Sequence, residues 1–136
     1  MIKHYKIEIS RKNRGYHIIT DEVLDTIMDL PSNGLLNLFI QHTSASIMIN
    51  ENADPTVRED LEQSFNRLVK EDEPWYKHTI EGSDDMPAHI KGAMIGFSMT
   101  IPIENGRLML GTWQGIYLCE FRNNAGARKL VATVYS

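Results

Sequence analysis

The sequence feature that most constrains the fold is the stretch of residues 97–110, which has the pattern of an antiparallel hairpin. Apolar side chains occupy every second position from 97 to 103, and a period of two predicts a strand with one buried face. Asn105 and Gly106 follow directly, and this pair favours a tight two-residue turn into a partner strand. Pro102 indicates an edge strand or a bulge, because proline cannot donate a hydrogen bond to a sheet ladder.

Strand-like and helix-like segments alternate through the rest of the chain. Residues 1–10 and 15–19 are predicted to pair as a hairpin, and the apolar run of residues 35–41 to form a strand covered on both faces. Residues 47–49, 116–122 and 128–135 complete the expected strands. Three helices are expected: the first capped by Thr20, the second opened by Asp54 and Pro55 and running to about Lys70, and the third capped by Ser83 and ended by Gly96.

Length and composition exclude several classes of protein. The 136 residues carry a formal net charge of -4 and one cysteine, Cys119, which cannot pair within the chain. This length predicts one domain, residues 1–136. A negative net charge argues against broad nucleic-acid binding, and no leader-like segment or long apolar run is present. We therefore expect a cytoplasmic protein with no nucleic-acid partner and no membrane span.

Residues 78–89 form a dense group of ionisable side chains. Three carboxylates, those of Glu81, Asp84 and Asp85, lie between His78 and His89. On a helix, Asp85 and His89 are one turn apart and share a face. Because clusters of this kind are typical of catalytic and metal-binding sites, we interpret this segment as the core of a site.

Metal binding is one interpretation of the histidines. His42, His78 and His89 lie on three separate predicted elements, and three neutral imidazoles with an open position suit a zinc-like transition metal. Magnesium is the alternative, because it prefers oxygen ligands, and the candidate carboxylates for it are Glu51, Asp84 and Asp85. Neither Cys-x-x-Cys nor His-Glu-x-x-His spacing occurs, and histidines with structural or acid–base roles produce the same scattered pattern.

Other polar groups lie at the ends of apolar strands. Ser44 or Ser46 could act as the nucleophile of a triad, although the chain has no Gly-x-Ser-x-Gly elbow. In the loop of residues 111–115, Trp113 either presents a flat surface to a ligand or fills the core. Glu120 lies on an otherwise apolar strand face, so its carboxylate is expected to be salt-bridged or part of a site.

Four segments of the chain resemble the YjbQ-like family, which is described as a family of secondary thiamine-phosphate synthase enzymes. The segments are His42-Thr43-Ser44-Ala45-Ser46, Glu51-Asn52-Ala53-Asp54-Pro55, residues 78–89 and the signature Gly111-Thr112-Trp113-Gln114-Gly115-Ile116. The resemblance covers essentially the whole chain, in the same order. Many relatives have a histidine after the strand glutamate where this chain has Phe121, so an acid–base role is not carried over to that position.

The resemblance implies a fold, an assembly and a set of site residues. The fold is a single-domain α+β structure, β-sandwich-like, with mainly antiparallel sheets and about three helices. The assembly is a homotrimer with polar sites near the subunit interfaces. The implied site residues are, as catalytic groups, Ser44, Glu51, Asp54, Glu81, Asp85 and Glu120; as substrate-binding groups, Asn52, Thr112, Trp113, Gln114 and Arg128; and as metal ligands, His42, His78 and His89.

The implied activity couples an aminopyrimidine methyl diphosphate to a thiazole phosphate with release of pyrophosphate. Such a transferase needs a divalent cation and basic groups for the leaving diphosphate, together with a flat pocket for the rings. The expected groups are Asp84, Asp85 and Glu51 for magnesium, Arg128 and Lys91 for phosphate, and Trp113 for the rings. Three histidines exceed what this reaction needs, so we expect it to be a secondary activity on a small phosphorylated substrate. The competing expectation is a non-catalytic trimer that binds a metal or a small anion.

Overall fold

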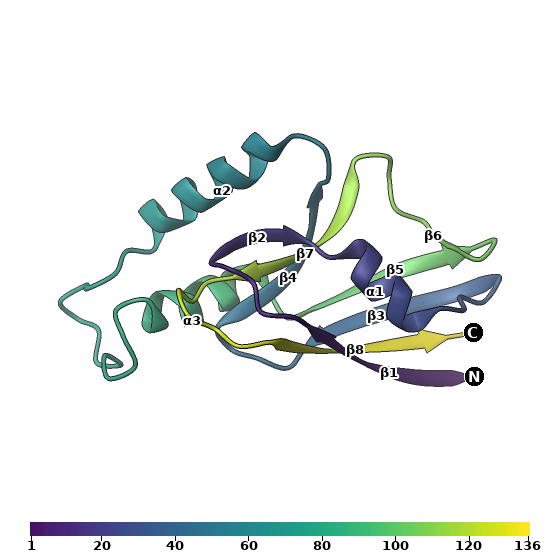
Figure 1. Cartoon of the computed structure of the whole chain (residues 1–136), viewed down its shortest axis with the longest axis horizontal. Helices are drawn as coiled ribbons and strands as arrows, with labels where there is room; N and C mark the ends of the chain where they lie inside the picture. The colour runs from purple at the N-terminus through teal and green to yellow at the C-terminus, as the bar shows by residue number, and fades with distance from the viewer.

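The structure, a computed structural model, describes residues 1–136 and contains eight strands and three helices (Figure 1). In chain order these are β1 (Ile2–Ile9), β2 (Gly15–Ile18), α1 (Thr20–Ile27), β3 (Asn33–Ile40), β4 (Ala45–Glu51), α2 (Pro55–Leu68), α3 (Asp85–Ile95), β5 (Ser98–Glu104), β6 (Arg107–Leu108), β7 (Gln114–Glu120) and β8 (Arg128–Tyr135). The expected α+β class with three helices is confirmed.

The strands form two antiparallel sheets. The larger sheet has the order β1-β8-β3-β5-β6 and the smaller one the order β2-β7-β4. The two termini lie side by side at one end of the molecule, where β1 pairs with β8 (Figure 1). The predicted hairpin of residues 1–10 with 15–19 is wrong, because β1 pairs with β8 and β2 pairs with β7, so the intervening basic turn carries the chain from one sheet to the other.

The main core fills the space between the two sheets. It is built from the inner face of the larger sheet and from β4 and β7, and includes Leu36, Leu38, Ile101, Ile116 and Leu118. Alternate residues of β7 point the other way, into a second apolar cluster closed by residues of α2 and α3. β7 is therefore buried on both faces, and the arrangement is the expected two-layer sandwich. α1 adds Val23 and Ile27 to the main core, whereas α2 and α3 pack on the outer face of the smaller sheet.

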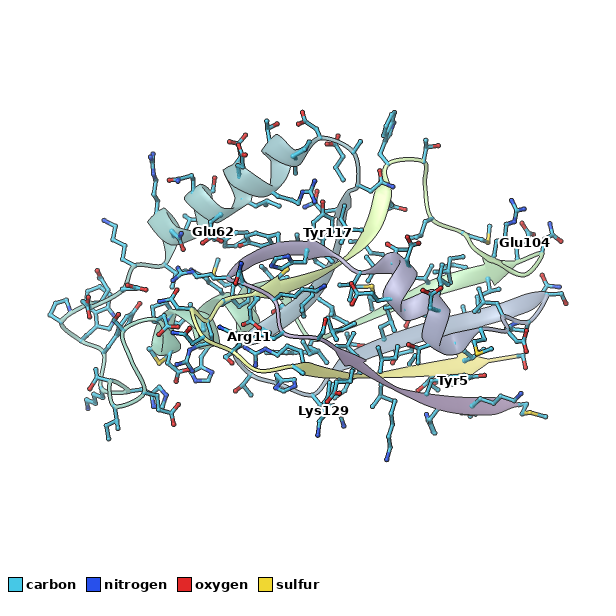
Figure 2. The ribbon with its side chains drawn as sticks, in the orientation of Figure 1. Tyr5, Arg11, Glu62, Glu104, Tyr117 and Lys129 are labelled. Atoms are coloured by element: carbon cyan, nitrogen blue, oxygen red, sulfur yellow. The ribbon has the colours of Figure 1, made fainter.

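The second cluster attaches α2 to the smaller sheet. Tyr117, labelled in Figure 2, lies beneath α2 and is fully buried, and Leu61 and Phe65 of the helix pack against this cluster. The Phe65 ring lies 6.3 Å from the ring of Tyr16. No residue of α2 is itself buried, so the helix covers β7 with one stripe and leaves its other faces exposed.

The hairpin prediction for residues 97–110 is confirmed. Asn105 and Gly106 have φ values of 52° and 72°, as a tight turn between two strands requires. β6 pairs only with Ile103 and Glu104, so Pro102 lies just beyond that ladder, where its carbonyl oxygen still accepts from the backbone N–H of Met109 at 2.9 Å. The prediction that residues 35–41 are covered on both faces is wrong, because Leu35 and Phe39 of β3 are almost half exposed on the outer face.

Helix boundaries show where tertiary contacts replaced local caps. Asp54 caps α2 as predicted, with its carboxylate accepting from the backbone N–H of Thr56, although the helix ends at Leu68. Thr20 does not cap α1: it is the first helical residue, and its hydroxyl oxygen accepts from the backbone N–H of Ile116 at 2.9 Å.

None of the helices has both the length and the apolar content that a membrane span requires.

The third helix also begins differently from the prediction. α3 starts at Asp85, and its N-cap residue Asp84 makes no side-chain capping bond. Ser83, the predicted cap, instead donates its hydroxyl to Glu71 at 3.4 Å. Asp84 instead pairs with Arg122, two residues beyond the end of β7, and this ion pair belongs to the candidate site.

Replacing Gly34 with alanine should destabilise the larger sheet. A Cβ atom at Gly34 would overlap the backbone carbonyl oxygen of Tyr135 on β8, and a ladder partner cannot move aside. We expect Gly34→Ala to lower the free energy of unfolding by about 1–3 kcal/mol, measured by urea denaturation. The control is Gly126→Ala, because a Cβ atom there meets no atom within 4 Å. Equal stability of the two variants would contradict this account of the sheet.

Candidate functional site

One carboxylate joins the two histidines of residues 78–89. The Oδ2 atom of Asp85 lies 2.6 Å from Nε2 of His78 and 3.0 Å from Nε2 of His89. The two imidazole centroids are 5.2 Å apart, and Asp85 is almost completely buried at 1% exposure. The three ligand atoms lie within 4.8 Å of one another. We call this group the His78–Asp85–His89 cluster.

Hydrogen bonds from outside the cluster orient His89 and Asp85. Nδ1 of His89 lies 3.0 Å from the backbone carbonyl oxygen of Thr43. Nη1 of Arg122 donates to Oδ1 of Asp85, while its Nε donates to Asp84 at 2.9 Å. The remaining Nη2 donates to the backbone carbonyl of Glu81 at 2.8 Å. Metal-binding histidines and carboxylates are commonly oriented by outer contacts of these kinds.

The ring of His89 faces two hydrogen-bond acceptors. A carbonyl oxygen at Nδ1 requires a proton on Nδ1, so in the neutral ring Nε2 carries a lone pair. That lone pair would point at the Asp85 carboxylate, which is repulsive. Either a second proton on His89 or a metal ion between Nε2 and Oδ2 removes the repulsion. The cluster therefore accommodates a cation.

Electrostatics keeps the carboxylates of the cluster ionised. Burial opposes the charge of Asp85, but hydrogen bonds from His78 and His89 and the charge of Arg122 outweigh it, so the pKa of Asp85 lies below its ordinary value. Burial likewise opposes the charge of Asp84, and the Asn123 backbone N–H and the Arg122 guanidinium lower its pKa. Two carboxylates share one guanidinium, which leaves an excess negative charge beside the histidines.

Close packing of α3 on the strand β4 makes the contact with Thr43. Asp85 and His89 are one helical turn apart on α3, as predicted. A Cβ atom at Gly92 would lie only 3.1 Å from the carbonyl oxygen of Thr43, so glycine permits this approach. Ser46 of β4 fastens the same place, because its hydroxyl donates to the carbonyl of Gly92 at 3.2 Å.

A second polar group lies between the two sheets. Glu120 at the end of β7 accepts from Arg128 at the start of β8, with Nε–Oε1 and Nη2–Oε2 distances of 2.7 and 2.6 Å. Both side chains are buried, and Nη2 also donates to the backbone carbonyl of Ser44 at 3.3 Å. His42 lies beside the pair, with Nδ1 3.3 Å from Nη1 of Arg128 and Nε2 accepting from the Lys129 backbone. Burial, together with the Arg128 charge, lowers the pKa of His42.

A third group surrounds the loop before β7. Asn52 donates its side-chain N–H groups to the backbone carbonyls of Thr112 and Gln114. The Gln114 amide oxygen accepts from the backbone N–H of Gly111, which closes the loop on itself. Trp113 is 64% exposed, so it does not fill the core. Glu51 accepts from the backbone N–H of Asp54 at 3.3 Å.

The structure separates the third group from the other two. Ala45 pairs with Glu120 at one end of the β4–β7 ladder, and Glu51 pairs with Gln114 at the other end. Six residues of extended strand correspond to about 20 Å. The expected single site, with the residues 78–89, His42 and the Trp113 loop together, is therefore not assembled within one chain. His42 lies outside the His78–Asp85–His89 cluster, and the predicted catalytic residue Asp85 supplies the third ligand atom instead.

The remaining predicted residues have these positions. Glu81 lies at the exposed margin of the cluster, with its carboxylate 3.8 Å from Nε2 of His78. Ser44 enters the second group through its backbone carbonyl. Lys91, expected to meet phosphate, is buried and donates to Asn66 at 2.7 Å. A pocket of about 260 Å³ adjoins His78 and is also lined by Glu73, Thr79 and Ser83.

Sequence reasoning missed Arg122 and the carbonyl of Thr43. Arg122 follows Glu120 by two positions in the predicted strand of residues 116–122, although β7 itself ends at Glu120. A second charge on an otherwise apolar strand face signals a paired group. That signal was available in the sequence. The role of Thr43 was not, because it depends on a backbone carbonyl whose partner is 46 residues away.

Comparison with known proteins gives one consistent result. The family model described as "UPF0047 protein YjbQ-like" matches residues 5–136. The UPF0047 protein YjbQ of Salmonella typhimurium is 52% identical over 130 residues, which cover 94% of each chain. The UPF0047 protein YugU of Bacillus subtilis is 38% identical over 124 residues, which cover 89% of each chain.

Solved structures have the same fold. A crystal structure from Clostridium acetobutylicum, described as an uncharacterized conserved protein of the YjbQ/UPF0047 family, superposes with a TM-score of 0.82 at 36% identity and covers 96% of this chain and 98% of its own. A YbjQ-like protein from Sulfolobus solfataricus superposes with a TM-score of 0.84 over 98% of this chain and 96% of its own. Its identity is 23%, so it supports the fold alone.

Removing the charge of Glu120 should destabilise the fold strongly. Glu120→Gln keeps the shape of the side chain but leaves the buried Arg128 guanidinium without its carboxylate. We expect the free energy of unfolding to fall by about 3–5 kcal/mol, measured by urea denaturation. The matched control is Glu104→Gln at the exposed β5–β6 turn, labelled in Figure 2, where a change within about 0.5 kcal/mol is expected. A loss at Glu120 no larger than at Glu104 would contradict the importance of the pair.

Proposed function

We propose that this chain, which belongs to the YjbQ-like UPF0047 family, is a small-molecule enzyme with a divalent-metal centre formed by His78, Asp85 and His89. The observation that carries the proposal is the convergence of three potential ligand atoms. The atoms of His89 and Asp85 that point away from the centre are already hydrogen-bonded, to the Thr43 carbonyl and to Arg122. Two imidazoles and one carboxylate with open positions are a donor set for zinc or another transition metal. Magnesium fits less well, because two of the three ligand atoms are nitrogens.

The distances between the ligand atoms and the groups around them also fit a metal ion. Ligand atoms on one metal at about 2.0–2.1 Å lie roughly 3 Å apart, and the Nε2–Oδ2 distances of 2.6 and 3.0 Å are close to this value. Thr43 fixes the Nδ1 proton of His89 and so leaves Nε2 free to bind. A bound divalent ion would also neutralise the excess negative charge near Arg122. When bound, it would supply Lewis-acid activation of an oxygen on the substrate or of water.

Three side chains around the proposed metal centre have separate roles in ligand access, in orientation of Asp85 and in proton transfer. His78 is nearly half exposed and adjoins the pocket of about 260 Å³, so a ligand can approach the cluster from that side. Arg122 keeps Asp85 ionised and oriented. Glu81, at the exposed margin, is placed to exchange a proton with a group bound beside His78.

Thiamine-phosphate synthesis fits this geometry only as a secondary activity. The groups expected for magnesium and for the rings, Glu51 and Trp113, lie at the far end of the β4–β7 ladder. Lys91 is buried and bonded to Asn66 rather than directed at the cluster. We therefore propose a small phosphorylated substrate other than the thiamine precursors, while the competing proposal remains a non-catalytic protein that binds metal.

We also propose that the chain assembles as a homotrimer through the outer face of the larger sheet. Ile2, Tyr135, Leu35 and Pro102 are neighbours in one row across four strands, and all are exposed. A row of exposed apolar residues on an open sheet face is typical of a contact surface.

Metal content tests the centre directly. Protein purified without a histidine tag and offered zinc or cobalt should retain about one ion per chain, because two imidazoles and a carboxylate dominate the affinity. His89→Ala and Asp85→Asn should each retain below about one tenth of an ion, and cobalt-loaded wild-type protein should show visible absorption that both variants lack. The control is His17→Gln, because His17 is bonded only to the carbonyl of Asn13.

The outcomes separate the two proposals. Turnover of a phosphorylated compound that is lost with the metal in folded His89→Ala protein would favour the enzyme. Stoichiometric metal without turnover of any candidate, thiamine precursors included, would favour the binding protein. Metal content that is negligible in the wild type, or unchanged in both variants, would exclude the centre.

Light scattering tests the assembly. The wild-type protein should have three times the mass of one chain. Leu35→Glu should shift the mass towards that of a single chain, because it places a charge in the apolar row and costs several kcal/mol on burial. Leu68→Glu, at an exposed apolar position on α2, is the control and should leave the mass unchanged. A monomeric wild-type protein would refute the proposed trimer.

A further inference from the structure

His42 is held in a position where its ring meets two hydrogen-bond donors. The β3–β8 ladder ends as the backbone N–H of Gln41 donates to the Lys129 carbonyl at 3.0 Å. The His42 ring then takes the place of the next strand acceptor, with Nε2 2.8 Å from the backbone nitrogen of Lys129. On its other side, Nδ1 lies 3.3 Å from Nη1 of Arg128. Arginine has no acceptor atom, so both neighbours are donors.

A neutral imidazole can accept only one of these hydrogen bonds. The shorter bond, from the Lys129 backbone, takes the lone pair of Nε2 and places the proton on Nδ1. The Nδ1–H of His42 and the Nη1–H of Arg128 then face one another with no acceptor between them. The other tautomer only moves the conflict, because Nε2–H would meet the Lys129 N–H at 2.8 Å. A charged ring would have both conflicts, which agrees with the lowered pKa of His42.

Arg128 cannot turn away from this contact. Its Nε and Nη2 are bound to the two oxygens of Glu120, and Nη2 also reaches the carbonyl of Ser44. Nη1 is thus the free end of a guanidinium whose side chain is only 8% exposed. The Arg128 Nη1–H and the His42 Nδ1–H form a rigid pair of donors that an oxygen atom can bridge. His42 is only partly buried whereas Arg128 is buried, so an oxygen atom can approach this pair of donors only from the side of His42.

The space beside His42 is mostly apolar. A pocket of about 290 Å³ is lined by His42, Thr43 and the aromatic rings of Phe39 and Phe97, with Ile40 and Gln41. Each charge nearby has a neighbour of the opposite sign. Glu120 is fully engaged by Arg128, and exposed Lys129, labelled in Figure 2 near the start of β8, has Glu8 as its cross-strand neighbour. The site therefore combines an oxyanion-binding end with an apolar body.

We propose that this pocket binds a small organic oxyanion, whose carboxylate or phosphate oxygen accepts from His42 Nδ1–H and Arg128 Nη1–H and whose apolar part lies between Phe39 and Phe97. The binding requires no metal. The pocket nevertheless adjoins the His78–Asp85–His89 cluster, because Thr43 lines it and holds His89 through its carbonyl. Thr43 is thus the link between a ligand anchored here and the proposed metal centre.

The test uses four probes on the full chain, with and without prior treatment by a chelator. Phenyl phosphate and benzoate contain both parts of the ligand, inorganic phosphate contains only the oxyanion, and benzyl alcohol contains only the apolar body. Calorimetry should show binding of phenyl phosphate or benzoate at least about tenfold tighter than inorganic phosphate and than benzyl alcohol. The affinity should be the same after chelation, which separates this inference from the metal proposal.

Two variants assign the contacts. His42→Gln retains an amide oxygen that can accept from the Lys129 N–H but lacks the Nδ1–H, so phenyl phosphate affinity should fall by about tenfold or more. His17→Gln removes a histidine outside the pocket and should leave the affinity unchanged. Phe39→Thr should weaken phenyl phosphate but not inorganic phosphate.

Nitrogen NMR of wild-type protein gives a readout that does not depend on any variant. His42 should be the Nδ1–H tautomer before addition of the ligand, and its Nδ1 resonance should shift when phenyl phosphate binds. Absence of binding at millimolar probe, equal binding by His42→Gln, or an Nε2–H tautomer would each overturn the proposal. Binding of inorganic phosphate alone, with no gain from the phenyl group, would overturn the assignment of the apolar pocket.

Discussion

The ion pair of Glu120 with Arg128 is the interaction on which the rest of the structure depends. It closes the gap between the two sheets at one end of the sandwich, where both charges are buried and hydrogen-bonded twice to each other. Burying two charges is costly unless their geometry is good, and the bidentate contact meets that condition. Arg128 then holds Ser44 through a carbonyl, and the flanking His42 and Thr43 follow. The pair thereby positions the segment that serves both proposed sites.

β7 joins the two apolar cores and ends at the charged residues of the candidate site. Its alternate side chains fill the main core and the cluster beneath α2, so the strand cannot shift without disturbing both. At its end Glu120 points between the sheets, and two residues later Arg122 reaches the carboxylates at the start of α3. The charged end of a rigid strand therefore fixes two guanidinium–carboxylate groups within a few residues. Residue 121 between them is a buried phenylalanine, which has no titratable group.

The two proposed sites use histidines in opposite ways. His89 faces a carbonyl and a carboxylate, so its environment favours a cation at the ring. His42 faces a backbone N–H and a guanidinium, so its environment favours an anion. Thr43 lies between them and contacts both groups, through its carbonyl and through the pocket that it lines. A metal and an oxyanion bound at two groups that Thr43 links would suit a small phosphorylated substrate, which is the class that we propose.

The sequence by itself determined the elements with strong local signals. These are the hairpin at Asn105 and Gly106, the cap of α2 by Asp54, and the placement of Asp85 and His89 one helical turn apart. Only the tertiary structure decided the long-range partners, such as Thr20 with Ile116, and the separation of the Trp113 loop from the histidines. Periodicity reports which face of an element is buried but not which distant backbone atom lies opposite it. For that reason, His42 and Arg128 could each be named as a candidate from the sequence, whereas their contact with one another and the tautomer of the His42 ring required the fold.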